Sequence, residues 1–371
     1  MGVPDYERDI TARMKQYVSN ARVDKLCEIE NAITFYDAQN SFWANNFPIS
    51  EEMKLEIIDN WSKRFPGLSL AIGVERYCSV SGIFSPNYLH DGLFYSLFDP
   101  YFNNERFATQ VDNKAYYPLL FYDIRLPKTI ALRINGLWQT SKYKPLVLDD
   151  VINACVDERK IVLKFCRYSS GGKGVVFKDT IDQDEIRSLF LSTNVDLIIQ
   201  KVLSQHSELN KIHNSSVNTV RIMTLLWKGR VHILSSVLRM GTNGQRVDNA
   251  SSGGIICGIT DSGQLKEYAY DKNGMRYVKH PSGVSFSDIT VPNFKTAKTL
   301  VSNLQYRFPY CRMISWDIAI DTAGIPTLIE ANMWRGELDF HQFCNGPIFG
   351  ELSNEIIEAV KEEVLGEDIN G

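Results

Sequence analysis

The segment that most constrains the fold of this chain is WDIAIDTAGIPTLIEAN, residues 316–332, in which two apolar runs flank the residues DTAG. A turn sequence between two apolar runs predicts a β-hairpin. If Ala323-Gly324 is a two-residue loop, Asp317 and Glu330 face each other across the two strands. Asn332 then lies on the same face as Glu330, one alternation further along.

Two carboxylates that face each other on an apolar hairpin repel, and burying either one without a partner costs several kcal/mol. A cation between them would remove both penalties. Two carboxylates and one amide are hard oxygen ligands that suit Mg²⁺, with phosphates and water completing the coordination. The predicted metal ligands, for one or two ions, are Asp317, Glu330 and Asn332.

Composition limits the class of protein. The 371 residues are 44% hydrophobic, which allows a large core divided among more than one domain or subdomain. Lys and Arg number 40 against 44 Asp and Glu, and the absence of a basic block disfavours nucleic-acid binding. The 7 cysteines form no CxxC pair and indicate reduced thiols in a cytoplasmic protein. Neither a signal peptide nor a transmembrane segment is expected.

The order of patterns along the chain predicts an α+β protein. Residues 1–65 have helical spacing, with Ser50 as the N-cap of a helix that starts with two glutamates. From Ile130 onward strands are expected, including one at 144–150, with a helix between two of them at 182–192. We therefore expect a helical or mixed region at 1–105 and a second domain at 106–371. Within that domain, a smaller lobe covers about 126–205 and a larger lobe about 206–365.

Residues 160–179 have the pattern of a strand, a Gly-rich turn and a second strand. Glycines allow backbone N–H groups to approach an anion, and a lysine in the first strand adds a point charge. An ordinary hairpin turn is the alternative, but the metal-ligand set on the same chain favours phosphate binding. The predicted phosphate-binding residues are Lys164, Ser170, Gly171, Gly172, Lys173 and Gly174.

Two arginines, Arg221 and Arg239, lie in otherwise apolar strand patterns. A surface ion pair is the ordinary explanation for each, but together they are candidates for binding an anionic intermediate. A polar stretch follows at 248–254, which is either a surface loop or a loop that faces the substrate. The candidate substrate-binding residues are Asn218, Asp248, Asn249, Ser252, Gly253 and Gly254.

Taken in order, the strand lysine, the Gly-rich loop and the D…E-x-N set resemble the ATP-grasp superfamily. A closer resemblance, over about residues 110–345, is to the sugar-transfer-associated ATP-grasp family. It is carried by segments 198–226, 238–255, 279–286 and 315–332. This resemblance implies two α+β lobes that clasp ATP. Members of the family are commonly linked with bacterial surface-polysaccharide synthesis.

The resemblance also implies nucleotide contacts. Lys114 is similar to the first ATP lysine of the superfamily, and Lys164 to the second. Residues 197–202 resemble the hinge strand that pairs with adenine. The implied contacts to adenine and ribose are Gln200, Lys201, Val202 and Glu208.

Together these features predict an ATP- and Mg²⁺-dependent carboxylate–amine ligase that forms an acyl phosphate and releases ADP and phosphate. Arg221 and Arg239 would stabilise the transferred phosphoryl group. The expected substrates are a carboxylated sugar or related acid and an amino acid or other amine. Two alternatives are an ATP-grasp kinase that phosphorylates a hydroxyl group and a non-catalytic nucleotide-binding partner of glycosyltransferases.

Overall fold

A computed structural model describes residues 23–167 and 174–366. The described chain forms two compact units, one of residues 23–102 with 346–366 and one of residues 103–345. The C-terminal helix therefore packs with the first unit, while the functional division predicted at residue 105 stays a prediction. None of the helices in the described ranges is both long and apolar enough to cross a bilayer.

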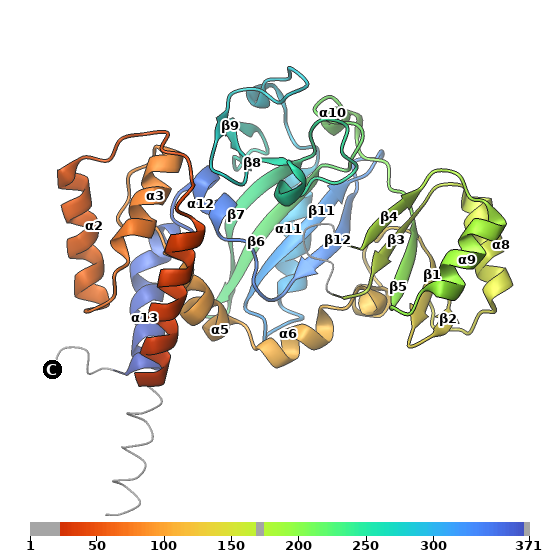
Figure 1. The fold of residues 1–371 in the computed structure, drawn as a ribbon, viewed down its shortest axis with the longest axis horizontal. Helices are drawn as coiled ribbons and strands as arrows, with labels where there is room; N and C mark the ends of the chain where they lie inside the picture. Colours follow the sequence, from red (N-terminus) through yellow and green to blue (C-terminus); the bar gives the residue numbers. More distant parts are fainter. Residues whose placement is uncertain (1–22, 168–173, 367–371) are drawn as a thin grey trace, which may run out of the picture. The chain divides into compact units, whose positions relative to one another are not determined.

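The first unit is helical, as predicted for the N-terminal region (Figure 1). After a helix whose described part covers residues 23–39, its elements are α2 (Glu51–Arg64), α3 (Ala71–Ser81), α4 (Asp91–Leu93), η1 (Phe94–Phe98), α5 (Asp99–Phe102), η6 (Gly350–Leu352) and α13 (Ser353–Leu365). The predicted N-cap is confirmed, because Ser50 Oγ accepts a hydrogen bond from Met53 N at 3.2 Å. A hydrogen bond of 2.7 Å from Tyr101 to Glu363 joins α5 to α13.

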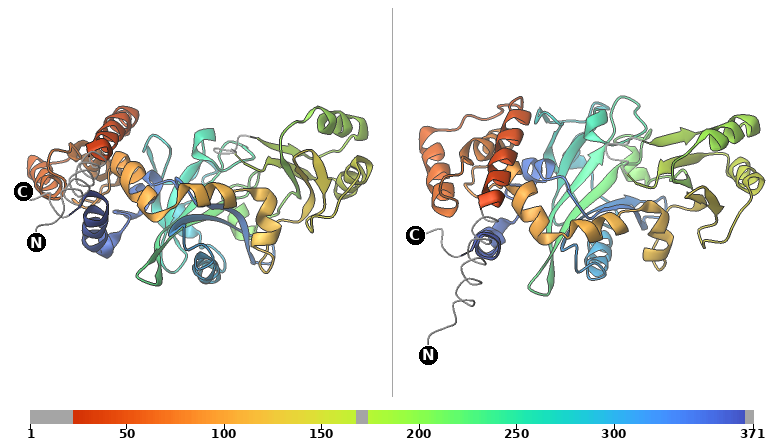
Figure 2. Two further views of the ribbon diagram at one scale, coloured as in Figure 1. Left: turned by 90° about the horizontal axis from the view of Figure 1, so that it is seen from below. Right: turned by 60° about the horizontal axis from the view of Figure 1, so that its bottom comes forward.

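The second unit contains a five-stranded antiparallel sheet with the strand order β2-β1-β5-β3-β4. Its strands are β1 (Thr129–Ile134), β2 (Leu137–Gln139), β3 (Ile161–Phe165), β4 (Val175–Lys178) and β5 (Leu197–Lys201). Two helices, α8 (Leu148–Glu158) and α9 (Gln183–Ser192), lie on one face of this sheet (Figure 2). Val162, Lys164 and Gln200 of this sheet line the cavity described below.

The strand predicted at 144–150 is wrong, because α8 begins at Leu148. Only Pro145 of that segment makes a β-bridge, to Gln139. Val151, Ile152 and Cys155 recur at helical spacing and pack against β3 and β5, so burial of this stripe selects a helix. The helix predicted at 182–192 is confirmed as α9.

A seven-stranded antiparallel sheet with the order β10-β9-β8-β7-β6-β11-β12 forms the rest of the second unit. Its strands are β6 (Thr219–Trp227), β7 (Arg230–Met240), β8 (Ile255–Ile259), β9 (Leu265–Tyr270), β10 (Arg276–Tyr277), β11 (Met313–Ile320) and β12 (Pro326–Asn332). The accompanying helices are α6 (Glu105–Val111), η2 (Lys114–Tyr116), α7 (Tyr117–Leu120), α10 (Ser207–Asn210), η4 (Ala250–Ser252), η5 (Phe286–Asp288), α11 (Phe294–Gln305) and α12 (Asp339–Asn345).

Strand alternation separates the polar residues of this sheet from its core. On β11, Trp316 and Ile318 are buried in the core on the side covered by α11, so Asp317 between them points to the opposite face. On β6, Ile222 is buried in the same core, and its neighbour Arg221 points to the same side as Asp317. The charged residues in these apolar strands therefore share one face.

The hairpin of β11 and β12 is confirmed, but the predicted two-residue turn is wrong. Asp321 N donates to Ile325 O at 3.1 Å, which closes a three-residue loop. The Asp321 carboxylate also accepts from the backbone N–H groups of Ala323 and Ile325, both at 2.9 Å. Gly324 has a φ of +77°, so the turn has a left-handed residue at its third position.

The predicted facing of Asp317 and Glu330 is nevertheless confirmed. Near the turn Ile318 faces Leu328, and the register shifts between Asp317 and Ile318. The additional residue in β12 is Ile329, which forms a bulge. Since this bulge compensates for the longer loop, Glu330 returns to its place opposite Asp317.

Candidate functional site

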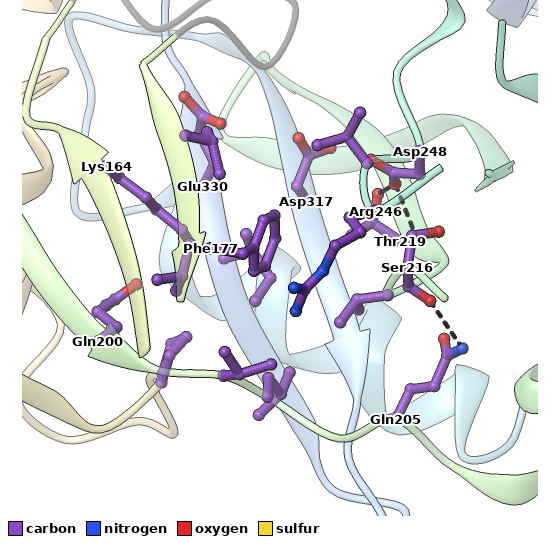
Figure 3. A pocket seen from close by; sticks show the side chains of 18 of the residues that line it. Lys164, Phe177, Gln200, Gln205, Ser216, Thr219, Arg246, Asp248, Asp317 and Glu330 are labelled. Carbon is purple, nitrogen blue, oxygen red and sulfur yellow. Dashed lines mark hydrogen bonds between the residues drawn. The ribbon is translucent and has the colours of Figure 1, made fainter. Parts of the chain in front are cut away.

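One cavity of about 800 Å³ lies between the two sheets of the second unit. Figure 3 shows Lys164 and Gln200 on the strands of the five-stranded sheet and the carboxylates of Asp317 and Glu330 on the hairpin across from them. The predicted site residues that line the cavity are Lys114, Lys164, Gln200, Lys201, Val202, Arg221, Arg239, Asp248, Asn249, Asp317, Glu330 and Asn332.

Asp317 is the centre of a buried ion-pair cluster. Arg221 Nε and Nη2 donate to its two carboxylate oxygens, both at 2.7 Å, and Arg239 Nη1 donates to Oδ2 at 3.1 Å. The exposed fractions of Asp317, Arg221 and Arg239 are 3%, 6% and 4%. Burial alone would raise the pKa of Asp317, but the two arginines outweigh it and hold that pKa below its ordinary value.

Glu330 is neutralised from a different part of the chain. Lys114, at the start of η2, donates from Nζ to Glu330 Oε1 at 2.5 Å and is itself buried. The cations opposite the facing carboxylates are therefore side chains, so the electrostatic argument that a metal ion must separate them is wrong. Asp317 and Glu330 nevertheless both line the cavity, so their carboxylate oxygens lie beside it.

The donor set fits Mg²⁺ in part. Asn332 Nδ2 donates to Ser315 O at 3.1 Å, so its amide oxygen is the atom left to bind a cation. Residues 23–167 and 174–366 contain no group of three or more His, Cys, Asp and Glu that could bind a metal by itself. The set of Asp317, Glu330 and Asn332 therefore suits an ion that takes the rest of its coordination from phosphates.

A tyrosine that the sequence reasoning missed positions the strand of Glu330 and Asn332. Ala331, which lies between them on β12, donates its N–H to Tyr117 Oη at 3.0 Å, and Tyr117 donates to Ala331 O at 3.4 Å. β12 is an edge strand, so these bonds occupy backbone groups that no neighbouring strand reaches. Burial raises the pKa of Tyr117 well above its ordinary value, so the phenol stays protonated.

Lys164 lies on β3 and lines the cavity, as expected for a phosphate-binding lysine. Burial, and then the positive charge of Lys114, lower its pKa to about 8. The two predicted strands are confirmed as β3 and β4, which pair with each other. Of the turn residues, Ser170 to Lys173 lie outside the described residues, and Gly174 has a φ of +72° but does not line the cavity.

The predicted adenine strand is β5. Gln200 is buried and lines the cavity, while the side chain of Lys201 forms an ion pair with Glu158 at 2.6 Å. The backbone N–H of Val202 donates to Lys160 O at 3.2 Å, so it is already engaged within the chain.

Several predicted residues lie away from the cavity. Asn218 is fully buried, and its Nδ2 donates to Leu209 O and His213 O at 3.0 and 2.9 Å, so it supports the chain before β6. Glu208 forms an ion pair of 2.5 Å with Lys211 instead of reaching the cavity. The remaining residues that do not line it are Ser252, Gly253 and Gly254.

The 248–254 stretch therefore contributes only its first two residues. Asp248 accepts a hydrogen bond from Thr219 N at 3.2 Å, and Asn249 accepts one from Arg239. A Cβ on Gly254 would meet Asp248 O at 2.5 Å, so this glycine packs closely against the loop. Of the candidate substrate-binding residues in this stretch, Asp248 and Asn249 line the cavity, and Ser252, Gly253 and Gly254 do not.

Two groups of cavity residues were not found from the sequence. Arg246 lies 4.2 Å from the centre of the Phe177 ring and forms an ion pair with Asp179, which connects the loop after β7 to β4 (Figure 3). Arg335 and Glu337, just after β12, also line the cavity. An Arg or Glu in a loop has no pattern that indicates such a place.

Residues 94–357 match the family described as sugar-transfer associated ATP-grasp. The match covers more than half of the chain, so the protein belongs to this family, as the resemblance predicted. The α+β architecture with a helical N-terminal region is the one expected for it. A comparison with curated proteins finds no match.

Similar solved structures include D-alanyl-alanine synthetase A from Vibrio cholerae, with 12% identity, 70% of this chain and 67% of that chain covered, and a TM-score of 0.43. The ATP-grasp ligase PsnB in complex with the precursor peptide PsnA2 and AMPPNP has 13% identity, coverages of 84% and 76%, and a TM-score of 0.41. An L-amino acid ligase from Bacillus licheniformis has 14% identity and a TM-score of 0.39, with 68% of this chain and 48% of that chain covered. The chain therefore spans about half the length of that enzyme. The family assignment rests on the family match and not on these distant structures.

Proposed function

We propose that this protein is an ATP- and Mg²⁺-dependent carboxylate–amine ligase. The observation that supports it is one cavity whose lining includes two lysines, two arginines and three oxygen-bearing side chains of the β11–β12 hairpin: Lys114, Lys164, Arg221, Arg239, Asp317, Glu330 and Asn332. Such a site offers cations for a triphosphate and for an anionic intermediate, and hard oxygens for a divalent ion. The chain would act in the cytoplasm, in the synthesis of bacterial surface polysaccharides.

The reaction would have two steps. A substrate carboxylate attacks the γ-phosphorus of ATP, the bond to ADP breaks, and an acyl phosphate forms. An amine nitrogen then attacks the acyl carbon, the bond from carbon to the phosphate oxygen breaks, and an amide and phosphate result. The contribution of the protein is positioning and charge neutralisation, because neither step needs a protein nucleophile.

Named residues would divide this work. Lys114 and Lys164 would neutralise phosphates of the nucleotide from the side of the five-stranded sheet. Arg221 and Arg239 would stabilise the transferred phosphoryl group and the acyl phosphate. The apolar wall for the adenine ring would come from Val162, Val175 and the bulged Ile329, which all line the cavity.

Asp317, Glu330 and Asn332 would bind Mg²⁺. Bound together with the nucleotide, the ion would neutralise charge on the β- and γ-phosphates. Asp248 and Asn249 would face the substrates from the loop after β7. The proposed substrates are a carboxylated sugar or related acid and an amino acid or other amine.

A substrate screen tests this proposal. Acids and amines are supplied in pairs with Mg·ATP, and release of ADP and phosphate is measured. A requirement for both members of a pair indicates ligation, and hydroxylamine in place of the amine should give a hydroxamate from the acyl phosphate. A kinase would instead form a stable phosphate ester without a hydroxamate, which would refute the ligase assignment.

A variant tests the metal assignment. Glu330→Ala should abolish Mg·ATP turnover. The matched control is Glu267→Ala, which removes an exposed glutamate from β9 of the same sheet, outside the cavity, and should leave turnover unchanged. Full activity of Glu330→Ala would contradict the role of this residue.

A further inference from the structure

Glu337 is a cavity carboxylate to which the reaction above gives no role. Its side chain is 41% exposed, compared with 27% for Glu330 and 5% for Asp317. It accepts a hydrogen bond from Nη1 of Arg221, the same arginine that binds Asp317. Glu337 therefore lies beside the buried cluster around Asp317, and it also lines the cavity.

The loop that carries Glu337 is fixed against the sheet. A Cβ on Gly336 would lie 2.7 Å from Ser315 Oγ, so this backbone is in close contact with β11. Arg335, the preceding residue, has a φ of +54°, which is uncommon for a residue other than glycine. Such a conformation persists where the surroundings impose it, so Glu337 is held in a defined place next to Arg221.

Without Glu337, the positive charges around this place would disfavour binding of an amine substrate. Arg221 and Arg239, which bind Asp317, line the same cavity and favour anions, while an ordinary amine reaches the protein as an ammonium ion. The oxygens of Asp317 are engaged by two arginines, and Glu330 is engaged by Lys114. Glu337 is also paired, through one oxygen with Arg221, but it is the most exposed of these three acids and is open to solvent, to which it can pass a proton.

We propose that Glu337 binds the ammonium group of the amine substrate and removes its proton. This inference rests on the proposed ligase function. The ammonium ion transfers one proton to Glu337, and the resulting lone pair on nitrogen attacks the acyl carbon. The bond from that carbon to the phosphate oxygen breaks, phosphate leaves, and the second N–H proton passes to the departing phosphate or to water as the amide forms.

The test is Glu337→Gln, which removes the negative charge and keeps the size of the side chain. Hydroxylamine is largely uncharged at neutral pH, so it can attack an acyl phosphate without a base. We expect the variant to form hydroxamate at the wild-type rate and to form amide from an ordinary amine roughly 100-fold more slowly. Amide formation should recover as the pH rises, because free amine then becomes available in solution.

Asp179→Asn is the matched control, since Asp179 is another exposed cavity carboxylate paired with an arginine. It should leave the ratio of amide to hydroxamate unchanged. If Glu337→Gln lowers both products equally, Glu337 only positions Arg221, and the proposal is overturned. It is also overturned if neither product changes. Absence of hydroxamate from the wild-type protein would instead refute the ligase function itself.

Discussion

Replacement of Asp317 by alanine should destabilise the second unit far more than an ordinary surface substitution. The change removes the acceptor of three hydrogen bonds, two from Arg221 and one from Arg239. Both arginines are more than nine-tenths buried, so water cannot replace the lost carboxylate. Two buried positive charges then remain close together with only part of their compensation.

The size of the effect follows from this geometry. Breaking a buried ion pair by removing one partner costs about 3–5 kcal/mol. For a domain of this size, each kcal/mol lowers the melting temperature by roughly 2–4 °C, so a decrease of roughly 6–20 °C is expected. The pKa of Asp317 is lowered in the folded protein, so its contribution is present above the pKa of the unfolded chain. The difference between wild type and variant should therefore shrink as the pH falls below about 4.

Thermal and urea denaturation without nucleotide measure this effect apart from any loss of activity. Glu337→Ala is the matched control, because Glu337 binds the same Arg221 but is 41% exposed, and its loss should cost less than about 1 kcal/mol. Equal denaturation midpoints for Asp317→Ala and the wild type would refute the role of Asp317 as the partner of both arginines.

Three further predictions concern other parts of the cavity. Burial lowers the pKa of Lys164 to about 8, so the proposed role of this lysine at the ATP phosphates predicts that ATP affinity falls as the pH rises past that value. Lys164→Arg should remove the fall, and a flat wild-type profile in binding measurements between pH 7 and 9 would contradict this. Tyr117→Phe leaves Ala331 N–H without its acceptor and should cost about 1–2 kcal/mol in chemical denaturation, whereas no change would mean that other groups fix β12. Arg246→Ala removes an exposed ion pair and should change the free energy of unfolding by less than about 1 kcal/mol. It should also speed hydrogen exchange in β4, because the contact of Arg246 with Phe177 is lost, and unchanged exchange would argue against that contact.

The local part of the hairpin could be predicted from the sequence, because strand alternation and burial decide which side chains share a face. Trp316 and Ile318 require the core, and this places Asp317 on the other face whatever the turn does. The turn itself was mispredicted, since the hydrogen bonds of Asp321 with its own loop select a three-residue connection. The sequence DTAG fits a two-residue turn and a three-residue turn equally well, and the hydrogen bonds of the Asp321 side chain decide between them.

The partners of the site residues could not be predicted in the same way. Lys114 and Glu330 are 216 residues apart in sequence, and their contact depends on how η2 packs beside the edge strand. Arg221 and Arg239 were recognised as unusual, but that both bind Asp317 follows only from the strand order β7-β6-β11. Sequence patterns give the face of a strand, whereas a pairing between distant segments is a property of the assembled sheet.

Under the proposed function, the two hairpin carboxylates would not be equivalent as metal ligands. An ionised carboxylate has about four lone-pair positions, and the arginines use three hydrogen bonds to the oxygens of Asp317. Glu330 accepts a hydrogen bond from Lys114 at Oε1 and is more exposed, so it has more capacity left for a cation. Asp317 is thus constrained mainly as the anchor of the arginines, and Glu330 is the carboxylate whose loss should weaken Mg²⁺ binding with the smaller effect on folding.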